Sequence, residues 1–150
     1  MSGSGSILRF FLAFLLLAGT GVAIAAQMVS VDRDEINMRS GPGIQYDAVF
    51  GLPRGYPLQV ITRRGEWFMV RDFENDVGWV YGPLTSGRPH VVVKVERLNI
   101  RKAPGTGNLV IAVARAGEVL GTLAHRSGWV RVKRADGVTG WVSRRLVWGW

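Results

Sequence analysis

The chain contains an internal duplication with an offset of 62 residues and no insertion between its first and last match. It is clearest in two motifs: residues 36–43 (Ile-Asn-Met-Arg-Ser-Gly-Pro-Gly) recur at 98–105 (Leu-Asn-Ile-Arg-Lys-Ala-Pro-Gly), and Gly-Trp-Val at 78–80 recurs at 140–142. A constant offset of this kind indicates two copies of one structural unit. We therefore expect a first repeat at residues 27–86 and a second repeat at residues 87–150.

Residues 1–26 have the pattern of a secretory signal peptide. Arg9 precedes the apolar residues 10–18, and the small residues Ala23-Ile24-Ala25-Ala26 follow. This order is typical of a signal helix with a cleavage site, which we place near Ala25 or Ala26. The alternative is an uncleaved membrane anchor, because the uncharged stretch 10–26 reaches the lower length limit of a membrane span. The pattern predicts a secreted or periplasmic protein.

The two repeats differ sharply in charge. Residues 27–86 hold 6 basic and 8 acidic residues, a net charge of −2, whereas residues 87–150 hold 12 basic and 3 acidic residues, a net charge of +9. In an exported chain such a basic half favours cell-wall carboxylates, anionic lipid headgroups or an acidic protein over nucleic acid. Docking on the acidic half, or a merely solvated surface, is the alternative.

Each repeat shows an all-β pattern. Short runs rich in β-branched and aromatic residues are separated by turn residues every 6–12 positions, and no cysteine is present to form disulfides. The predicted strands of the first repeat are 29–31, 48–52, 58–62, 67–71 and 77–81. Those of the second repeat are 91–95, 110–114, 119–124, 129–133 and 139–142. Because units of about 60 residues are marginally stable alone and the link between them is short, we expect the repeats to touch.

The motifs resemble those of the bacterial SH3-like (SH3b) domain. The shared order is (Ile/Leu)-Asn-x-Arg-x-x-Pro-Gly, a glycine at Gly55 or Gly117, a tryptophan opening a strand, and a closing Gly-Trp-Val, over roughly 28–84 and 90–146. The resemblance implies an all-β chain of two tandem small β-barrels, each five-stranded and partly open, after the signal helix. The second repeat departs from the pattern at Ala103, where the first has Gly41.

Alternation along the strands separates core from surface. Phe68 and Val70 share one face, as do Val130 and Val132, while the tryptophans take the other face. Tryptophans off the core are good platforms for peptide side chains or sugar rings. The resemblance adds a groove-lining role for Trp67 and Trp129. The candidate ligand-binding residues are Tyr46, Tyr56, Trp67, Trp79, Trp129 and Trp141, and the candidate basic surface is Arg131, Lys133, Arg134, Arg144 and Arg145. Coverage of a barrel end or of the seam between the repeats is the alternative role for the tryptophans.

The residues that usually carry catalysis are sparse. There is no cysteine nucleophile, and His90 and His125 have no metal-ligand spacing. The acidic residues near Asp32 lack a calcium-loop pattern, and we expect them to be solvated. The Asn-x-Arg motifs are expected to stabilise turns, with each arginine bonding a loop carbonyl or carboxylate. The sequence thus predicts no enzyme, no metal and no cofactor.

The sequence supports two functional hypotheses. The first is an exported, non-catalytic module that recognises cell-wall peptidoglycan or its peptides, which is what the family resemblance implies. The second is a periplasmic protein–protein adaptor, whose basic second repeat docks an acidic protein or an anionic lipid surface. The terminal residues Trp148-Gly149-Trp150 are expected to tuck onto the edge of a barrel.

Overall fold

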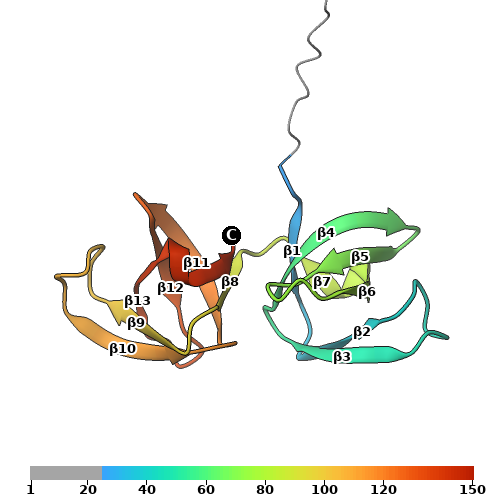
Figure 1. The fold of residues 1–150 in the computed structure, drawn as a ribbon, viewed down its shortest axis with the longest axis horizontal. Coiled ribbons are helices and arrows are strands. Elements are labelled where there is room, and N and C mark those ends of the chain that lie inside the picture. The colour runs from blue at the N-terminus through green and yellow to red at the C-terminus, as the bar shows by residue number, and fades with distance from the viewer. Residues whose placement is uncertain (1–24) are drawn as a thin grey trace, which may run out of the picture.

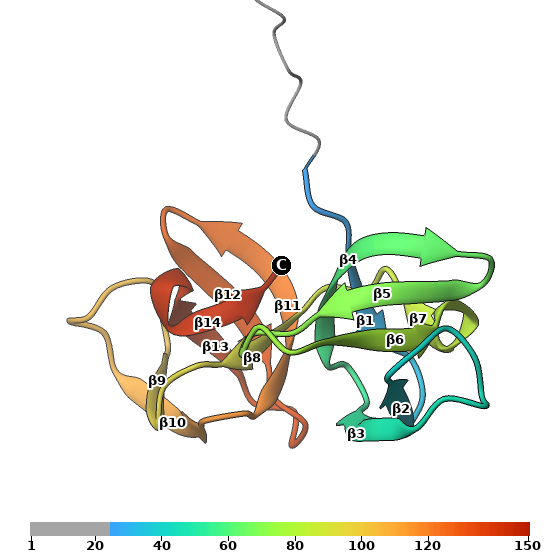
Figure 2. The same cartoon turned by 45° about the vertical axis from the view of Figure 1, so that its right-hand side comes forward.

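The computed structural model describes residues 25–150, and the predicted signal helix therefore lies almost entirely outside the described residues. Two antiparallel β-sheets, each curled on itself, lie side by side along the long axis of the molecule (Figure 1). Turning the molecule shows the same two bodies, joined by a single crossing of the chain (Figure 2). Within residues 25–150 no helix has the length and apolar character needed to cross a membrane. The all-β, two-barrel prediction is confirmed.

The first repeat contains seven strands and a short 3-10 helix. The sheet order is β3-β2-β6-β5-β4-β1-β7. The bounds are β1 (Met28–Val31), β2 (Glu35–Arg39), β3 (Ala48–Pro53), β4 (Pro57–Arg64), β5 (Trp67–Arg71), β6 (Val77–Tyr81), η1 (Gly82–Leu84) and β7 (Thr85–Ser86).

The second repeat has the same elements in the same order, β10-β9-β13-β12-β11-β8-β14. Its elements begin 62 residues after their counterparts, and only the last strand differs in length. The bounds are β8 (His90–Val93), β9 (Arg97–Arg101), β10 (Val110–Arg115), β11 (Val119–Arg126), β12 (Trp129–Lys133), β13 (Thr139–Ser143), η2 (Arg144–Leu146) and β14 (Val147–Gly149).

The sequence prediction missed two strands in each repeat: β2 and the short β7 in the first, and β9 and the short β14 in the second. In β2 only Ile36 and Met38 are buried, and Glu35 and Asn37 are exposed between them. Two apolar positions are too few to distinguish a strand from a turn by alternation alone. The motif predicted as a turn is therefore a strand that continues into a turn, and each sheet has seven strands rather than five.

The predicted division of faces is confirmed. Val70, Val130 and Val132 are completely buried, and Phe68 packs against the first core. The cores are built from the inward residues of each barrel. Buried residues of the first core are Val29, Val31, Ile36, Met38, Leu52, Leu58, Val70 and Val80. Those of the second are Val91, Val93, Leu98, Ile100, Ala114, Leu120, Val130, Val132, Val142 and Val147.

The repeats touch through the start of the second barrel. The Ser30 hydroxyl donates to the Arg88 carbonyl at 2.8 Å in the connecting segment. His90 packs on Gly55, where an added Cβ would come within 2.7 Å of the imidazole Cδ2. The end of the chain closes the second barrel, because β14 pairs with β8 and the Trp150 amide donates to the His90 carbonyl at 3.1 Å. Both the contact and the terminal tuck were expected from the sequence.

Candidate functional site

A groove of about 610 Å³ opens on the outer side of the first barrel. One wall comes from β2 and the loop that follows it, and the other from the start of β5, the end of β6 and η1. Its lining residues are Glu35, Ile36, Asn37, Arg39, Pro42, Gly43, Ile44, Gln45, Trp67, Tyr81 and Leu84. The groove therefore combines aromatic, charged and amide side chains on one concave surface, as peptide and small-ligand sites do.

The aromatic wall consists of Trp67 and Tyr81. These residues lie opposite each other on β5 and β6, and their ring centroids are 5.4 Å apart at an interplanar angle of 49°. The Tyr81 hydroxyl donates to Glu66 Oε2 at 2.8 Å, and this hydrogen bond raises the pKa of Tyr81. Because Glu66 holds the phenol and Trp67 packs beside it, both rings are pre-positioned for a ligand.

The facing wall is held by Arg39. Its guanidinium donates to the Tyr46 carbonyl at 2.9 Å and to the Ile44 carbonyl at 3.4 Å. In the second repeat Arg101 donates to the Asn108 carbonyl at 2.8 Å. The prediction that these arginines bond loop carbonyls is thus confirmed. The loop also brings Ile44, which is 81% exposed, to the rim of the groove.

The six predicted aromatic residues do not gather in one place. Trp67 lines the groove, whereas Trp79 is only 7% exposed and lies under the Arg64 guanidinium, 5.7 Å from its ring centroid. The expectation that Trp79 is an open platform is wrong, because neighbouring side chains on the outer face cover it. Tyr56 packs against the first core, and Tyr46 is exposed. Trp129 and Trp141 are half-buried on the second barrel.

Sequence reasoning did not single out Tyr81 or Ile44. Tyr81 follows the Gly-Trp-Val motif, and its importance appears only when β6 is placed in register with Trp67. The corresponding positions in the second repeat are Ser143 and Thr106. The aromatic groove is therefore a property of the first repeat, and the duplication has not kept it.

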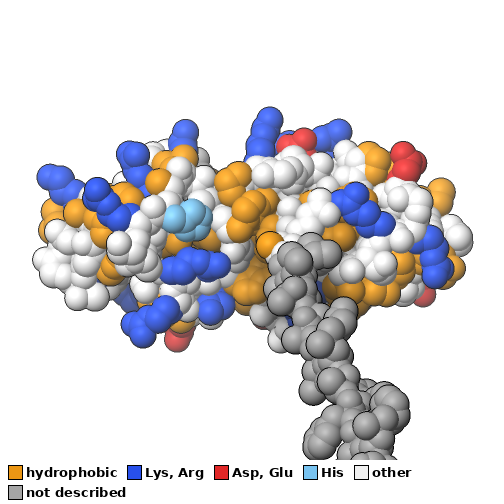
Figure 3. All heavy atoms as spheres, turned by 90° about the horizontal axis from the view of Figure 1, so that it is seen from above, with side chains coloured by type: hydrophobic (Ala, Val, Ile, Leu, Met, Phe, Trp, Pro, Cys, Tyr) orange, Lys and Arg blue, Asp and Glu red, His pale blue; other side chains and the backbone are white. Residues whose placement is uncertain are grey.

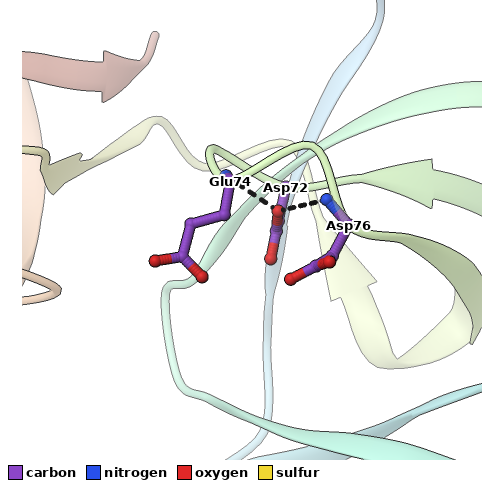
Figure 4. A group of neighbouring side chains, drawn as sticks. All are labelled: Asp72, Glu74 and Asp76. Carbon is purple, nitrogen blue, oxygen red and sulfur yellow. Dashed lines mark hydrogen bonds between the residues drawn. The ribbon is translucent and has the colours of Figure 1, made fainter.

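Three carboxylates meet in the turn between β5 and β6 (Figure 4). Oxygen atoms of Asp72, Glu74 and Asp76 lie within 4.8 Å of one another. Asp72 is 5% exposed, and its Oδ1 accepts the backbone amides of Glu74 and Asp76, each at 2.9 Å. Its Oδ2 accepts the Tyr56 hydroxyl at 3.4 Å. The Asp72 carboxylate thus organises the turn and joins it to the core.

The acidic residues singled out from the sequence lie elsewhere and are paired with arginines. Asp34 and Arg54 form an ion pair at 3.0 Å, and Asp32 lies within 4.0 Å of Arg33 and Arg88. These pairs are largely exposed, so each contributes at most about 1 kcal/mol. They match the expectation of a solvated acidic segment.

Tyr56 makes the stability of the first barrel dependent on alkaline pH. Burial raises the pKa of Tyr56 above its ordinary value of 10.0, and the negative charge of Asp72 raises it further. The fold therefore favours the neutral phenol: this stabilisation is complete below pH 10 and is lost as the pH rises above it. We expect the free energy of unfolding to fall by less than about 1.4 kcal/mol per pH unit there, because solvent screens the half-exposed group.

Urea unfolding between pH 8 and pH 11.5 measures this dependence. In Tyr56→Phe we expect the free energy of unfolding to fall less steeply above pH 10, the alkaline limb of the pH profile. Tyr46→Phe, which removes an exposed hydroxyl, serves as the control. The second repeat contains no tyrosine, so it reports the background in the same sample. An alkaline limb equally steep in wild type and Tyr56→Phe would contradict the assignment.

Comparison with known families identifies the two barrels. Two family models, each described as "Bacterial SH3 domain", match the chain, one at residues 34–86 and the other at residues 94–149. The chain belongs to the bacterial SH3 domain family. The first repeat is its first SH3 domain and the second repeat its second, and the resemblance seen in the sequence motifs is confirmed.

A sequence relative of the SH3 pair is the putative N-acetylmuramoyl-L-alanine amidase YrvJ of Bacillus subtilis (strain 168). It is 27% identical over 139 residues, which are 85% of this chain and 27% of the relative. The chain thus spans about a quarter of that protein. This match overturns the expectation that the chain is no enzyme, because the stretch it resembles is part of a putative amidase.

Solved structures with some likeness include NlpC1 from Trichomonas vaginalis, at 12% identity and a TM-score of 0.38, with 89% of this chain and 49% of that chain covered. An NlpC/P60 family protein from Bacillus cereus ATCC 10987 has 11% identity and a TM-score of 0.38, with 83% and 56% covered.

Proposed function

We propose that the first SH3 domain binds a peptide of the bacterial cell wall in its aromatic groove, and that the chain acts on peptidoglycan outside the cytoplasm. The observation that carries the proposal is the Trp67–Tyr81 wall of a concave site, in a domain pair similar to part of a putative N-acetylmuramoyl-L-alanine amidase. The secretory pattern of residues 1–26 supports the location. None of the matches reported above concerns an acidic protein or a lipid.

The groove suits a short peptide that carries both apolar and polar groups. Trp67 and Tyr81 offer a large contact area with few rotatable bonds, which lowers the entropy lost on binding. Glu35 and Asn37 line the same groove and are exposed, so they can accept hydrogen bonds from peptide amides or an amino group.

Trp67→Ala is expected to weaken binding of a purified, sugar-free stem peptide of the cell wall by about tenfold or more, because loss of an aromatic anchor typically costs at least about 1.4 kcal/mol. Calorimetric titration with the stem peptide measures the affinity. Tyr81→Phe keeps the ring but frees Glu66, and a smaller loss is expected.

Trp129→Ala is the matched control, since Trp129 occupies the equivalent position of the second SH3 domain. It should leave the affinity for the sugar-free stem peptide unchanged. Equal losses in Trp67→Ala and Trp129→Ala, or wild-type affinity in Trp67→Ala, would rule out the groove as the peptide site.

A further inference from the structure

Tryptophans and cations alternate on the outer face of β11, β12 and β13. The strand register places Trp129 between Arg126 and Ser143 in one row of the sheet. In the next row Arg131 lies between Ala124 and Trp141. On its other side Trp141 lies opposite Arg101 of β9. Directly opposite residues in antiparallel strands project from the same face. The tryptophans and arginines of these rows therefore share one surface.

The first SH3 domain has different residues at the same positions. Tyr81, whose ring packs on Trp67, is replaced by Ser143, so Trp129 has no aromatic neighbour opposite it. Met69, which lies beside Trp79, is replaced by the exposed Arg131. The duplication has thus exchanged an aromatic and an apolar side chain for a small hydroxyl and a cation, and this change favours an anionic ligand over an apolar one.

The same face continues toward the seam between the domains. Gly121 lies between His90 and Lys133 in the third row. Its counterpart in the first domain is Gln59, whose side chain accepts a hydrogen bond from Arg71. In the second domain a cavity of about 450 Å³ lies at this position, and its lining includes two cations of this face and the imidazole of His90. The lining residues are Arg54, His90, Val119, Gly121, Leu123, Lys133, Arg134 and Ala135.

The charges along this face are only partly neutralised. Arg134 pairs with Glu118 at 2.8 Å and Arg54 with Asp34 at 3.0 Å. Within residues 25–150, by contrast, no acidic group lies within 4.0 Å of Arg131 or Lys133. Seen from above, Lys and Arg side chains gather over the second domain with few acidic groups among them (Figure 3).

We infer that this outer face, from Trp129 to the cavity at Gly121, binds a linear glycan that carries repeated acidic groups. Sugar rings stack on Trp129 and Trp141, and the acidic groups pair with Arg131 and Lys133. These two cations alternate along β12 at about 6.6 Å, twice the rise per residue of a strand, so they meet successive charges of an extended chain. The site is separate from the groove of the first domain and goes beyond the proposed peptide binding.

Calorimetric titration with three probes tests the inference: oligogalacturonate, neutral cellohexaose and linear polyphosphate of matched charge. We expect binding of oligogalacturonate that weakens with salt, and at least about tenfold weaker binding of cellohexaose and polyphosphate, because rings and charges are both required. A fourth probe, a phosphorylated mannan oligosaccharide, distinguishes phosphate from carboxylate as the acidic group. Polyphosphate binding as tight as oligogalacturonate, or no preference for oligogalacturonate over cellohexaose, would overturn the inference.

Variants separate this face from general positive charge. Arg131→Gln changes an exposed residue and should weaken oligogalacturonate binding about threefold and reduce its salt dependence. Lys94→Gln also removes an exposed charge, one that lies outside this face, and should have no effect. Trp129→Ala should weaken binding with the salt dependence unchanged, provided that its thermal unfolding is normal, and Trp67→Ala should bind as wild type. Equal effects of Arg131→Gln and Lys94→Gln would contradict the site.

Discussion

Gly140→Ala is expected to destabilise the second SH3 domain by about 3 kcal/mol, a large part of the stability of so small a domain. A Cβ at this position would lie 2.6 Å from Ile100 Cγ2 and 2.8 Å from the Arg101 carbonyl oxygen. Ile100 is completely buried, and the carbonyl belongs to the backbone of β9. Rotating a side chain cannot move the Arg101 carbonyl oxygen, and the packed core leaves no space into which the Ile100 methyl group could rotate. The backbone must therefore shift.

This backbone shift would occur at the β9–β13 pairing, where the strands of the barrel are joined by the fewest paired residues. β13 and β9 are paired through one register position only, Trp141 opposite Arg101, and this pairing joins the two parts of the sheet. Moving the Arg101 carbonyl away from Gly140 disturbs that pairing directly. The glycine of the Gly-Trp-Val motif is thus explained by close approach of two strands.

Urea unfolding followed by fluorescence measures the loss, with Gly121→Ala as the matched control. Gly121 lies in the same sheet, and the nearest atom to its added Cβ is the Lys133 carbonyl oxygen at 3.7 Å, an ordinary contact. That control should change the free energy of unfolding by less than about 0.5 kcal/mol. In the first domain Gly78→Ala should be milder than Gly140→Ala, because it meets the flexible Met38 side chain and a carbonyl at 3.0 Å. Similar midpoints for Gly140→Ala and Gly121→Ala would contradict the close-approach explanation.

The tandem barrels could be predicted from the sequence because the information is local and repeated. Alternation places Phe68 and Val70 inward whatever the rest of the chain does, since successive side chains of a strand point to opposite faces. Turn residues are a weaker guide than alternation. Asp136-Gly137 is a typical two-residue hairpin turn, which would put Val132 opposite Trp141, whereas the structure pairs Val132 with Gly140 through a five-residue loop, 134–138.

The groove could not be predicted in full because it depends on contacts between distant segments. Trp67 was singled out from its motif, but its partner Tyr81 is 14 residues away and becomes its neighbour only through the β5–β6 register. Trp79 looked equivalent to Trp67 in sequence, yet Arg64 from β4 covers it. The residues within the chain likewise gave no sign of an enzyme, and that expectation was corrected by similarity to a longer protein.

The turn that follows β5 shows how the two domains diverged in charge while keeping one contact. In the first domain the Tyr56 hydroxyl donates to Asp72. The equivalent positions in the second domain are Glu118 and Arg134, which form an ion pair at 2.8 Å. The same two sites therefore hold a donor and an acceptor in both domains, with the roles reversed. Each turn also keeps an equivalent backbone hydrogen bond. The Asp72 amide donates to the Asp76 carbonyl, and the Arg134 amide donates to the Val138 carbonyl.

Asp72→Ala is expected to destabilise the first SH3 domain by about 3 kcal/mol, because it leaves the amides of Glu74 and Asp76 and the Tyr56 hydroxyl without their acceptor. Asp136→Ala is the control: it removes one hydrogen bond to the Val138 amide and a 3.7 Å ion pair with Arg134, from a side chain that is 52% exposed, and should cost less than about 1 kcal/mol. Urea unfolding of the two variants gives the comparison. Equal costs would show that the buried carboxylate does not hold the turn.

The exchanged pair tests the contact itself. Asp72→Arg alone places a cation beside a phenol and should be as damaging as Asp72→Ala. Adding Tyr56→Glu rebuilds the pair found at Glu118 and Arg134, and we expect it to recover about 1 to 2 kcal/mol of the loss. Tyr56→Glu alone, which sets Glu beside Asp72, should be destabilising because two like charges then meet in a half-buried site. The contradicting result is a double variant whose loss in free energy of unfolding equals the sum of the two single losses. The two positions would then act independently, and the contact between them would not be what the duplication preserved.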